Sequence, residues 1–106
     1  MSQTTSNVSE RHSISVIIPA YNRAGLIGET LRSLLNQTVP AKEIIVVDDG
    51  STDTTKSTIH ELNDSRIKYI YQKNAGVCAA RNTGAKQAEG EFLIFLDSDD
   101  TVEKSW

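Results

Sequence analysis

The sequence predicts an α/β protein built in three layers, a parallel sheet with helices on both faces. Short runs of β-branched and other apolar residues alternate with segments whose apolar residues recur at helical spacing. The order along the chain is strand, helix, strand, helix, strand, helix, strand. The strand-like runs are apolar at successive positions, which is typical of strands covered on both faces. Right-handed crossovers between such strands produce a parallel sheet.

Composition indicates one small globular domain. The chain has 106 residues, of which 38% are hydrophobic and 24% are charged, with a net charge of −3. Basic residues are scattered and outnumbered, which argues against a nucleic-acid binder. No apolar run reaches the roughly 20 residues of a membrane span. We expect a cytoplasmic protein, at most peripheral to a membrane, with a disordered leader over residues 1–12 and one domain over residues 13–106.

The first predicted strand is Ile14–Ile18. Pro19 is expected to stop it, because proline cannot donate to a central ladder. A loop over residues 20–23 then leads into a helix over residues 24–36. Four apolar residues recur along that helix at helical spacing, namely Ile27, Leu31, Leu34 and Leu35.

The second predicted strand covers residues 44–47 and runs into the polar segment Asp48-Asp49-Gly50-Ser51. Ser51 or Thr52 is expected to cap the next helix, with Asp53 in its positive first turn. A short third strand is expected over residues 67–71.

The last two predicted elements are a helix over residues 76–88 and a strand over residues 91–96. Gly90 is expected to end the helix, and the strand reads as buried on both faces. The inner positions of the helix are small and four apart, which lets it pack closely on the sheet: Ala80, Gly84 and Ala88.

Polar residues follow three of the predicted strands, and the carboxyl ends of parallel strands meet at one rim where ligands bind. Asp97, Asp99 and Asp100 lie within four residues of one another. Such crowded carboxylates repel one another unless a cation neutralises them, and Mg²⁺ or Mn²⁺ prefers oxygen ligands. The alternative is an acidic surface turn.

Other candidates follow from residue chemistry at the same rim. Tyr21 could stack on a nucleobase and Arg23 could face a phosphate. Asp49 could accept a hydrogen bond from a base N–H or a ribose hydroxyl. Arg81, in a helix whose first N–H groups suit an anion, could reach a diphosphate, with Lys73 a weaker candidate. The plainer interpretations are an exposed tyrosine, a capped turn and a solvated arginine.

Neither glycine-rich nucleotide motif, G-x-G-x-x-G or G-x-x-x-x-G-K, follows the first strand. Four segments of the sequence, taken together, resemble the amino-terminal half of a family 2 glycosyltransferase with the GT-A fold. The matching residues run in order over about Ile14 to Asp100, and they are Val16–Asn22, Ile45–Asp53, Asn74–Gly84 and Glu89–Asp100.

The resemblance implies binding of a nucleotide-diphospho-sugar, commonly a UDP-sugar. Pro19 and Tyr21 would lie against the base, which Asp49 would hydrogen-bond. Arg81 would approach the phosphates or the base.

The resemblance also implies a divalent metal, Mn²⁺ or Mg²⁺, held by the D-x-D residues. Asp99 would be the direct ligand and Asp97 would lie nearer the ribose, with Asp97 a second metal-ligand candidate. The metal would neutralise the departing diphosphate. Family members mostly invert the anomeric centre through a carboxylate base that deprotonates an acceptor hydroxyl, on a saccharide or a lipid-linked acceptor.

The chain departs from this pattern because no residue matches the catalytic base. We therefore expect the donor-binding half of a transferase, an incomplete domain that binds nucleotide without transferring sugar. The segment Phe92–Leu96 would then be an exposed apolar edge that favours self-association.

Rival interpretations are a non-catalytic nucleotide-sugar-binding or regulatory module, a receiver-type signalling domain and a sugar nucleotidyltransferase. A receiver domain places its acidic pair after the first strand, and a nucleotidyltransferase needs a Gly-rich basic loop there. Here that strand ends in Pro-Ala-Tyr.

Overall fold

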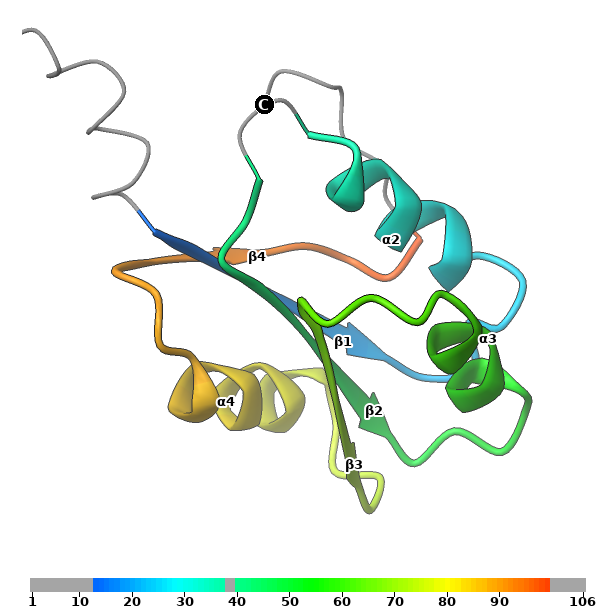
Figure 1. The fold of residues 1–106 in the computed structure, drawn as a ribbon. Helices are drawn as coiled ribbons and strands as arrows, with labels where there is room; N and C mark the ends of the chain where they lie inside the picture. Colours follow the sequence, from blue (N-terminus) through cyan, green and yellow to red (C-terminus); the bar gives the residue numbers. More distant parts are fainter. Residues whose placement is uncertain (1–12, 38–39, 100–106) are drawn as a thin grey trace, which may run out of the picture.

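The computed structural model describes residues 13–37 and 40–99, so the predicted leader and Asp100 lie outside the described residues. Four parallel strands form one sheet in the order β3-β2-β1-β4 (Figure 1). The strands are β1 (Ile14–Ala20), β2 (Glu43–Asp49), β3 (Ile67–Gln72) and β4 (Phe92–Phe95). The helices between them are α2 (Ile27–Leu35), α3 (Thr55–Glu61) and α4 (Val77–Gln87).

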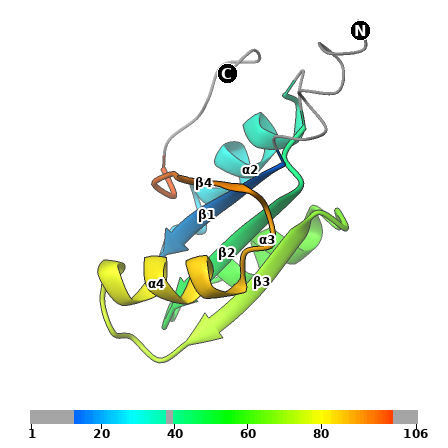
Figure 2. The same ribbon diagram turned by 90° about the vertical axis from the view of Figure 1, so that its left-hand side faces the viewer.

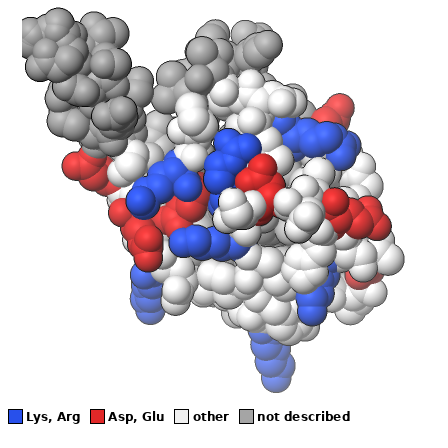
Figure 3. All heavy atoms as spheres, viewed as in Figure 1, with Lys and Arg blue, Asp and Glu red and all other residues white. Residues whose placement is uncertain are grey.

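The helices lie on both faces of the sheet, which confirms the predicted fold class. Figure 2 shows α4 on one face and α2 and α3 on the other. Within the described residues, no helix combines the length and the apolar character needed to cross a bilayer. On the face shown in Figure 3, the Lys and Arg side chains lie among Asp and Glu side chains.

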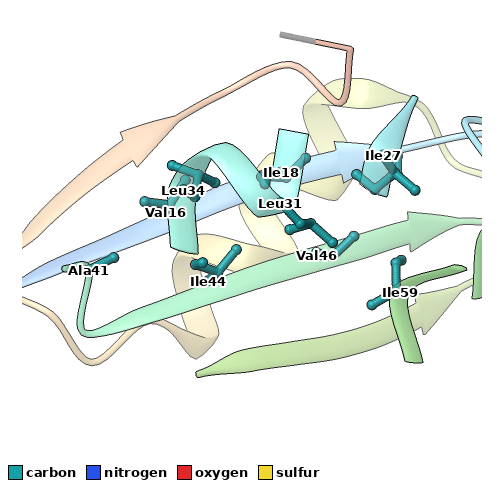
Figure 4. Packing of buried hydrophobic residues seen from close by; sticks show 10 residues of the cluster. Val16, Ile18, Ile27, Leu31, Leu34, Ala41, Ile44, Val46 and Ile59 are labelled. Carbon is teal, nitrogen blue, oxygen red and sulfur yellow. The ribbon is translucent and has the colours of Figure 1, made fainter. Parts of the chain in front are cut away.

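Two apolar clusters join the layers. The larger one packs α2 and α3 against β1 and β2 (Figure 4), and its buried members are Val16, Ile18, Ala20, Ile27, Leu31, Leu34, Ala41, Ile44, Val46 and Ile59. The smaller cluster lies under α4 and contains Ile45, Val47 and Ala80. The helix sits so close to the sheet that a Cβ on Gly84 would lie 2.5 Å from Cγ2 of Ile17. This close contact is what the small inner residues of α4 predicted.

Strand β1 continues through Pro19, so the prediction that proline stops it is wrong. The carbonyl of Ile17 accepts a hydrogen bond from Leu96 N–H at 3.1 Å, which shows that Ile17 faces the β4 side. Pro19, two residues further, faces the same side because alternate residues of a strand direct their backbone groups to the same neighbour. The register of β4 on β1 ends at Ile17, so no ladder bond is missing at Pro19.

Helix starts also differ from the predictions. Helix α2 begins later than residue 24, because the N–H groups of Leu26 and Ile27 both bond to the carbonyl of Arg23 in a preceding turn. Helix α3 begins at Thr55, beyond the predicted capping residues and beyond Asp53. The Asp53 carboxylate accepts the N–H of Thr55 at 2.9 Å, so it caps the helix from outside.

Strand β4 lies at the edge of the sheet and pairs with β1 alone among the described strands. Phe92, Leu93 and Phe95 are 50%, 40% and 47% exposed, so the prediction of a strand buried on both faces is wrong. The expectation of an exposed apolar edge is confirmed. Gly90 does not end α4; its N–H donates to Ser15 Oγ at 2.8 Å, a close approach of the chain to β1.

At the amino-terminal end of β2, Glu43 is buried, with only 2% of its surface exposed. Its carboxylate accepts bonds from Ser15 Oγ and from Glu89 N–H, both at 2.6 Å, and pairs with Lys68 Nζ at 2.7 Å. Burial acts to raise the pKa of Glu43, but these donors outweigh it and lower the pKa from 4.5 to about 2. Glu43 therefore ties three strands and the α4–β4 connection together.

Candidate functional site

A cavity of about 270 Å³ opens at the carboxyl ends of β1, β2 and β4, beside the start of α4. Its lining residues come from four separate segments of the chain, as the shared rim predicted, and they are Pro19, Ala20, Tyr21, Arg23, Asp49, Val77, Asp97, Ser98 and Asp99. Of the site residues proposed from the sequence, only Arg81 is absent from this lining. The weaker candidate Lys73 does not line the cavity either.

The loop that carries Tyr21 is fastened to the β2–α3 loop through Asn22. Asn22 adopts a positive φ of 53°, a conformation that asparagine tolerates better than most residues. Its Oδ1 accepts the N–H of Thr52 and its own N–H donates to Ser51 Oγ, both at 2.8 Å. The next residue, Arg23, donates its N–H to the hydroxyl of Thr55, the first residue of α3. Tyr21 is thus held at the rim with its side chain 47% exposed.

Asp49 is buried at the end of β2, where its carboxylate accepts four hydrogen bonds. Oδ1 accepts from Gln72 Nε2 and from Ala75 N–H, both at 2.8 Å. Oδ2 accepts from Gly76 N–H at 3.0 Å and from Asn74 Nδ2 at 3.2 Å. Burial acts to raise the pKa of Asp49, but the bonds from Gln72, Ala75 and Gly76 outweigh it and hold the pKa below its ordinary value. These four donors fill the four lone-pair positions of the carboxylate.

Two N–H groups just before α4 bind the protein's own carboxylate. The sequence indicated that N–H groups near Gly76 suit an anion, and Asp49 takes the N–H groups of Ala75 and Gly76. Thr83 in α4 donates to Gln72 Oε1 at 2.6 Å, which orients the Gln72 amide toward Asp49. A chain of side-chain contacts thus runs from α4 through β3 to the end of β2.

The neighbouring residue, Asp48, does not line the cavity, because its side chain lies on the opposite face of the sheet. It accepts the N–H of Ser51 at 2.9 Å and the hydroxyl of Tyr69. Burial and this bond to Asp48 raise the pKa of the Tyr69 phenol. The two adjacent aspartates have different positions because successive side chains of a strand point to opposite faces.

The D-x-D segment forms a turn at the cavity edge. Ser98 is buried between the two aspartates, and its carbonyl accepts a hydrogen bond from Thr30 Oγ1 of α2 at 3.0 Å. Asp97 Oδ1 lies 3.6 Å from Arg81 Nη2 in a pair whose side chains are 62% and 41% exposed. Arg81 thus contacts Asp97 without lining the cavity itself. Because both side chains are exposed, the pair contributes little to stability.

Asp97 and Asp99 could hold a divalent metal whose other ligands come from a phosphate and water. Among residues 13–37 and 40–99, no three His, Cys, Asp or Glu side chains are grouped as a metal site by themselves. Asp97 and Asp99, however, bring hard carboxylate oxygens to one cavity edge. Magnesium-like ions are commonly held by one or two carboxylates together with substrate phosphate and water.

Several contributors to this site carry no recognisable signal in the sequence. Val77 and Ser98 line the cavity although their side chains suggest no ligand chemistry. Thr30 reaches Ser98 across 68 positions of the chain, so no local pattern could pair them. Asn22 had a usable signal, since an asparagine in a strand-to-helix loop favours positive φ.

Comparisons with known proteins agree on one family. The model described as "Glycosyl transferase family 2" matches residues 15–106. An uncharacterized glycosyltransferase of Rickettsia conorii is 50% identical over 92 residues, which are 86% of this chain and 15% of that protein. The chain therefore spans about 15% of the length of that relative.

Two solved structures share the fold. TarS of S. aureus in complex with UDP-GlcNAc has a TM-score of 0.81 at 42% identity, over 87% of this chain and 28% of that one. The mannosyltransferase PcManGT from Pyrobaculum calidifontis, in complex with GDP-Man and Mn²⁺, has a TM-score of 0.80 at 31% identity, over 86% of this chain and 28% of that one.

Proposed function

This chain belongs to glycosyl transferase family 2 and has its GT-A-type α/β fold, and we propose that its rim cavity binds the nucleotide-diphospho-sugar donor of a sugar transfer. One observation carries the proposal: Tyr21, Asp49 and Asp99, from distant parts of the chain, line the same cavity. The bound UDP-GlcNAc and GDP-Man of the two similar structures support this donor class. We propose a UDP-sugar as the donor.

The nucleobase is proposed to lie against Pro19 and the half-exposed ring of Tyr21, whose face can stack on a base. Asp49 is proposed to accept the base N–H. Because all four lone-pair positions of Asp49 are used, the base would replace the longest of its bonds, the 3.2 Å bond from Asn74 Nδ2. Asn74 Nδ2 would keep its 2.9 Å bond to the carbonyl of Asp49.

The diphosphate is proposed to lie between Arg23 and the D-x-D turn. Three carboxylates line the cavity, so an anionic diphosphate needs a cation beside it. Asp99 is proposed as the direct ligand of Mn²⁺ or Mg²⁺, with Asp97 nearer the ribose or as a second ligand. When bound, the metal supplies charge neutralisation of the diphosphate leaving group. Arg81, 41% exposed behind Asp97, is proposed to turn toward the phosphates.

The transfer itself is proposed to invert the anomeric centre through a carboxylate base, a role that no residue of this sequence matches. The acceptor is proposed to be the hydroxyl of a saccharide or of a lipid-linked sugar. This chain would then bind the donor without transferring sugar. Its exposed β4 edge is proposed to pair with a second copy of the chain.

Calorimetric titration of the full chain with UDP, GDP and their sugars, with and without Mn²⁺, tests the proposal. We expect metal-dependent binding that is lost in Asp99→Ala. A matched control is Asp64→Ala, which removes a carboxylate that pairs with Arg66 and does not line the cavity. Binding that needs no metal would favour the non-catalytic nucleotide-binding module. Absence of binding to every nucleotide would overturn the proposed function.

A further inference from the structure

Thr30 of α2 donates a hydrogen bond to the D-x-D turn, residues 97–99. Thr30 has no exposed surface, and its Oγ1 lies 3.0 Å from the carbonyl oxygen of Ser98. The same hydroxyl lies 3.4 Å from the carbonyl of Leu26, one helical turn earlier. A hydroxyl carries one proton, so the shorter contact identifies Ser98 as its main acceptor. Thr30 itself does not line the cavity, whereas Asp97, Ser98 and Asp99 all do.

Among residues 13–37 and 40–99, few other polar contacts join this turn to the body of the protein. Strand β4 ends at Phe95, and one further backbone bond joins Leu96 to β1. In the described part of the chain, the other polar contact of residues 97–99 is the exposed pair between Asp97 and Arg81 at 3.6 Å. The Thr30 hydroxyl therefore provides the buried anchor of the turn. Its removal would leave the Ser98 carbonyl without a partner, which favours rearrangement of the turn.

We propose that Thr30 is a positioning residue of the donor site, because its hydroxyl sets where Asp97 and Asp99 stand relative to the rest of the cavity. This inference rests on the proposed function, and it concerns the metal-dependent part of nucleotide binding. Side chains that orient the ligands of a metal typically change metal affinity by about 10- to 100-fold when they are removed. Thr30 acts through the backbone of the turn, so a loss of about tenfold, the lower end of that range, is expected.

The test compares Thr30→Val, which keeps the shape and removes the hydroxyl, with Thr30→Ser, which keeps the hydroxyl. Mn²⁺-dependent binding of UDP should weaken about tenfold in T30V and return to nearly the original affinity in T30S. Binding of UDP without metal should be equal in all three proteins. Hydrogen exchange, measured without nucleotide, should show faster exchange at the amides of Ser98 and Asp99 in T30V alone.

A matched control is Thr58→Val in α3. The Thr58 hydroxyl lies 3.1 Å from a carbonyl one helical turn earlier, that of Thr54, and 3.5 Å from the carbonyl of Ala24, and none of these three residues lines the cavity. T58V should therefore bind UDP and Mn²⁺ like the original chain.

The outcomes separate this inference from the proposed function. If the original chain binds UDP with Mn²⁺ and T30V binds it equally well, the role of Thr30 is overturned and the proposed function stands. Equal weakening in T30S and T30V would also overturn the role, because the hydroxyl would not be responsible. If the original chain binds no nucleotide under any condition, the proposed function and this inference fall together.

Discussion

The carboxylate of Asp49 accepts the backbone N–H of Gly76 at 3.0 Å, which joins the end of β2 to the residue that precedes α4. Gly76 has a φ of 101°, a conformation that L side chains rarely adopt. A buried carboxylate at the end of one strand thus shapes the loop after the next strand. The same carboxylate lines the cavity, so the packing of the rim and the proposed base contact depend on one side chain.

Asp49→Asn should destabilise the protein by about 2 kcal/mol, because its amide NH₂ would face N–H donors and leave buried groups unpaired. Urea unfolding followed by circular dichroism measures this change. Asp64→Asn is the control, since Asp64 forms a partly exposed pair with Arg66 and its loss should change stability by less than about 1 kcal/mol. Equal unfolding midpoints for the two variants would show that the bonds of Asp49 contribute no more than a surface pair.

Stability should fall in acid through Glu43. Its pKa is lowered from 4.5 to about 2 in the folded protein, so its contribution is complete above pH 4.5 and is lost as pH falls toward 2. A shift of this size corresponds to about 3 kcal/mol at neutral pH.

The measurement is urea unfolding of the original chain and of Glu43→Gln between pH 7 and pH 2. The difference between the two isolates Glu43, because the other carboxylates are present in both. We expect the original chain to be more stable at pH 7 and the two to converge near pH 2. A difference that stays constant over the whole range would contradict the assignment.

Gly84→Ala should destabilise the protein by about 1–3 kcal/mol although alanine favours helices more than glycine does. The added Cβ would lie 2.5 Å from Ile17 Cγ2 and 3.2 Å from Val47 Cγ2, and both atoms belong to the sheet. Gly28→Ala in α2 is the control, because its Cβ would meet the flexible Arg32 guanidinium and Thr58 Cγ2 at 3.4 Å. Thermal unfolding should show a lower midpoint for G84A and an unchanged or higher one for G28A.

Self-association through β4 stays a prediction that light scattering can check. Leu93 and Phe95 are 40% and 47% exposed on an edge strand, so we expect the mass to rise with concentration. Phe95→Lys should return the chain to a monomer. Tyr71→Lys, at a 60% exposed position on the opposite edge strand, should leave association unchanged. A single monomeric mass at high concentration for the original chain would rule out pairing through β4.

The order of the elements, the parallel sheet and the rim at which Tyr21, Asp49 and Asp99 meet could all be predicted from the amino-acid sequence. These features depend on local apolar patterns and on the handedness of crossovers, both of which can be read along the chain. The family resemblance was visible for the same reason, because its motifs are short and contiguous.

The contacts that hold those residues in place could be found only in the folded structure. Pro19 fits inside β1 only because β4 is shorter, Asp49 receives its donors from the loop before α4, and Thr30 meets Ser98 from another layer. Arg81 lies behind Asp97 and not on the cavity wall. Each of these contacts joins residues that are far apart in the sequence, so it depends on strand register and helix packing, which exist only once the chain has folded.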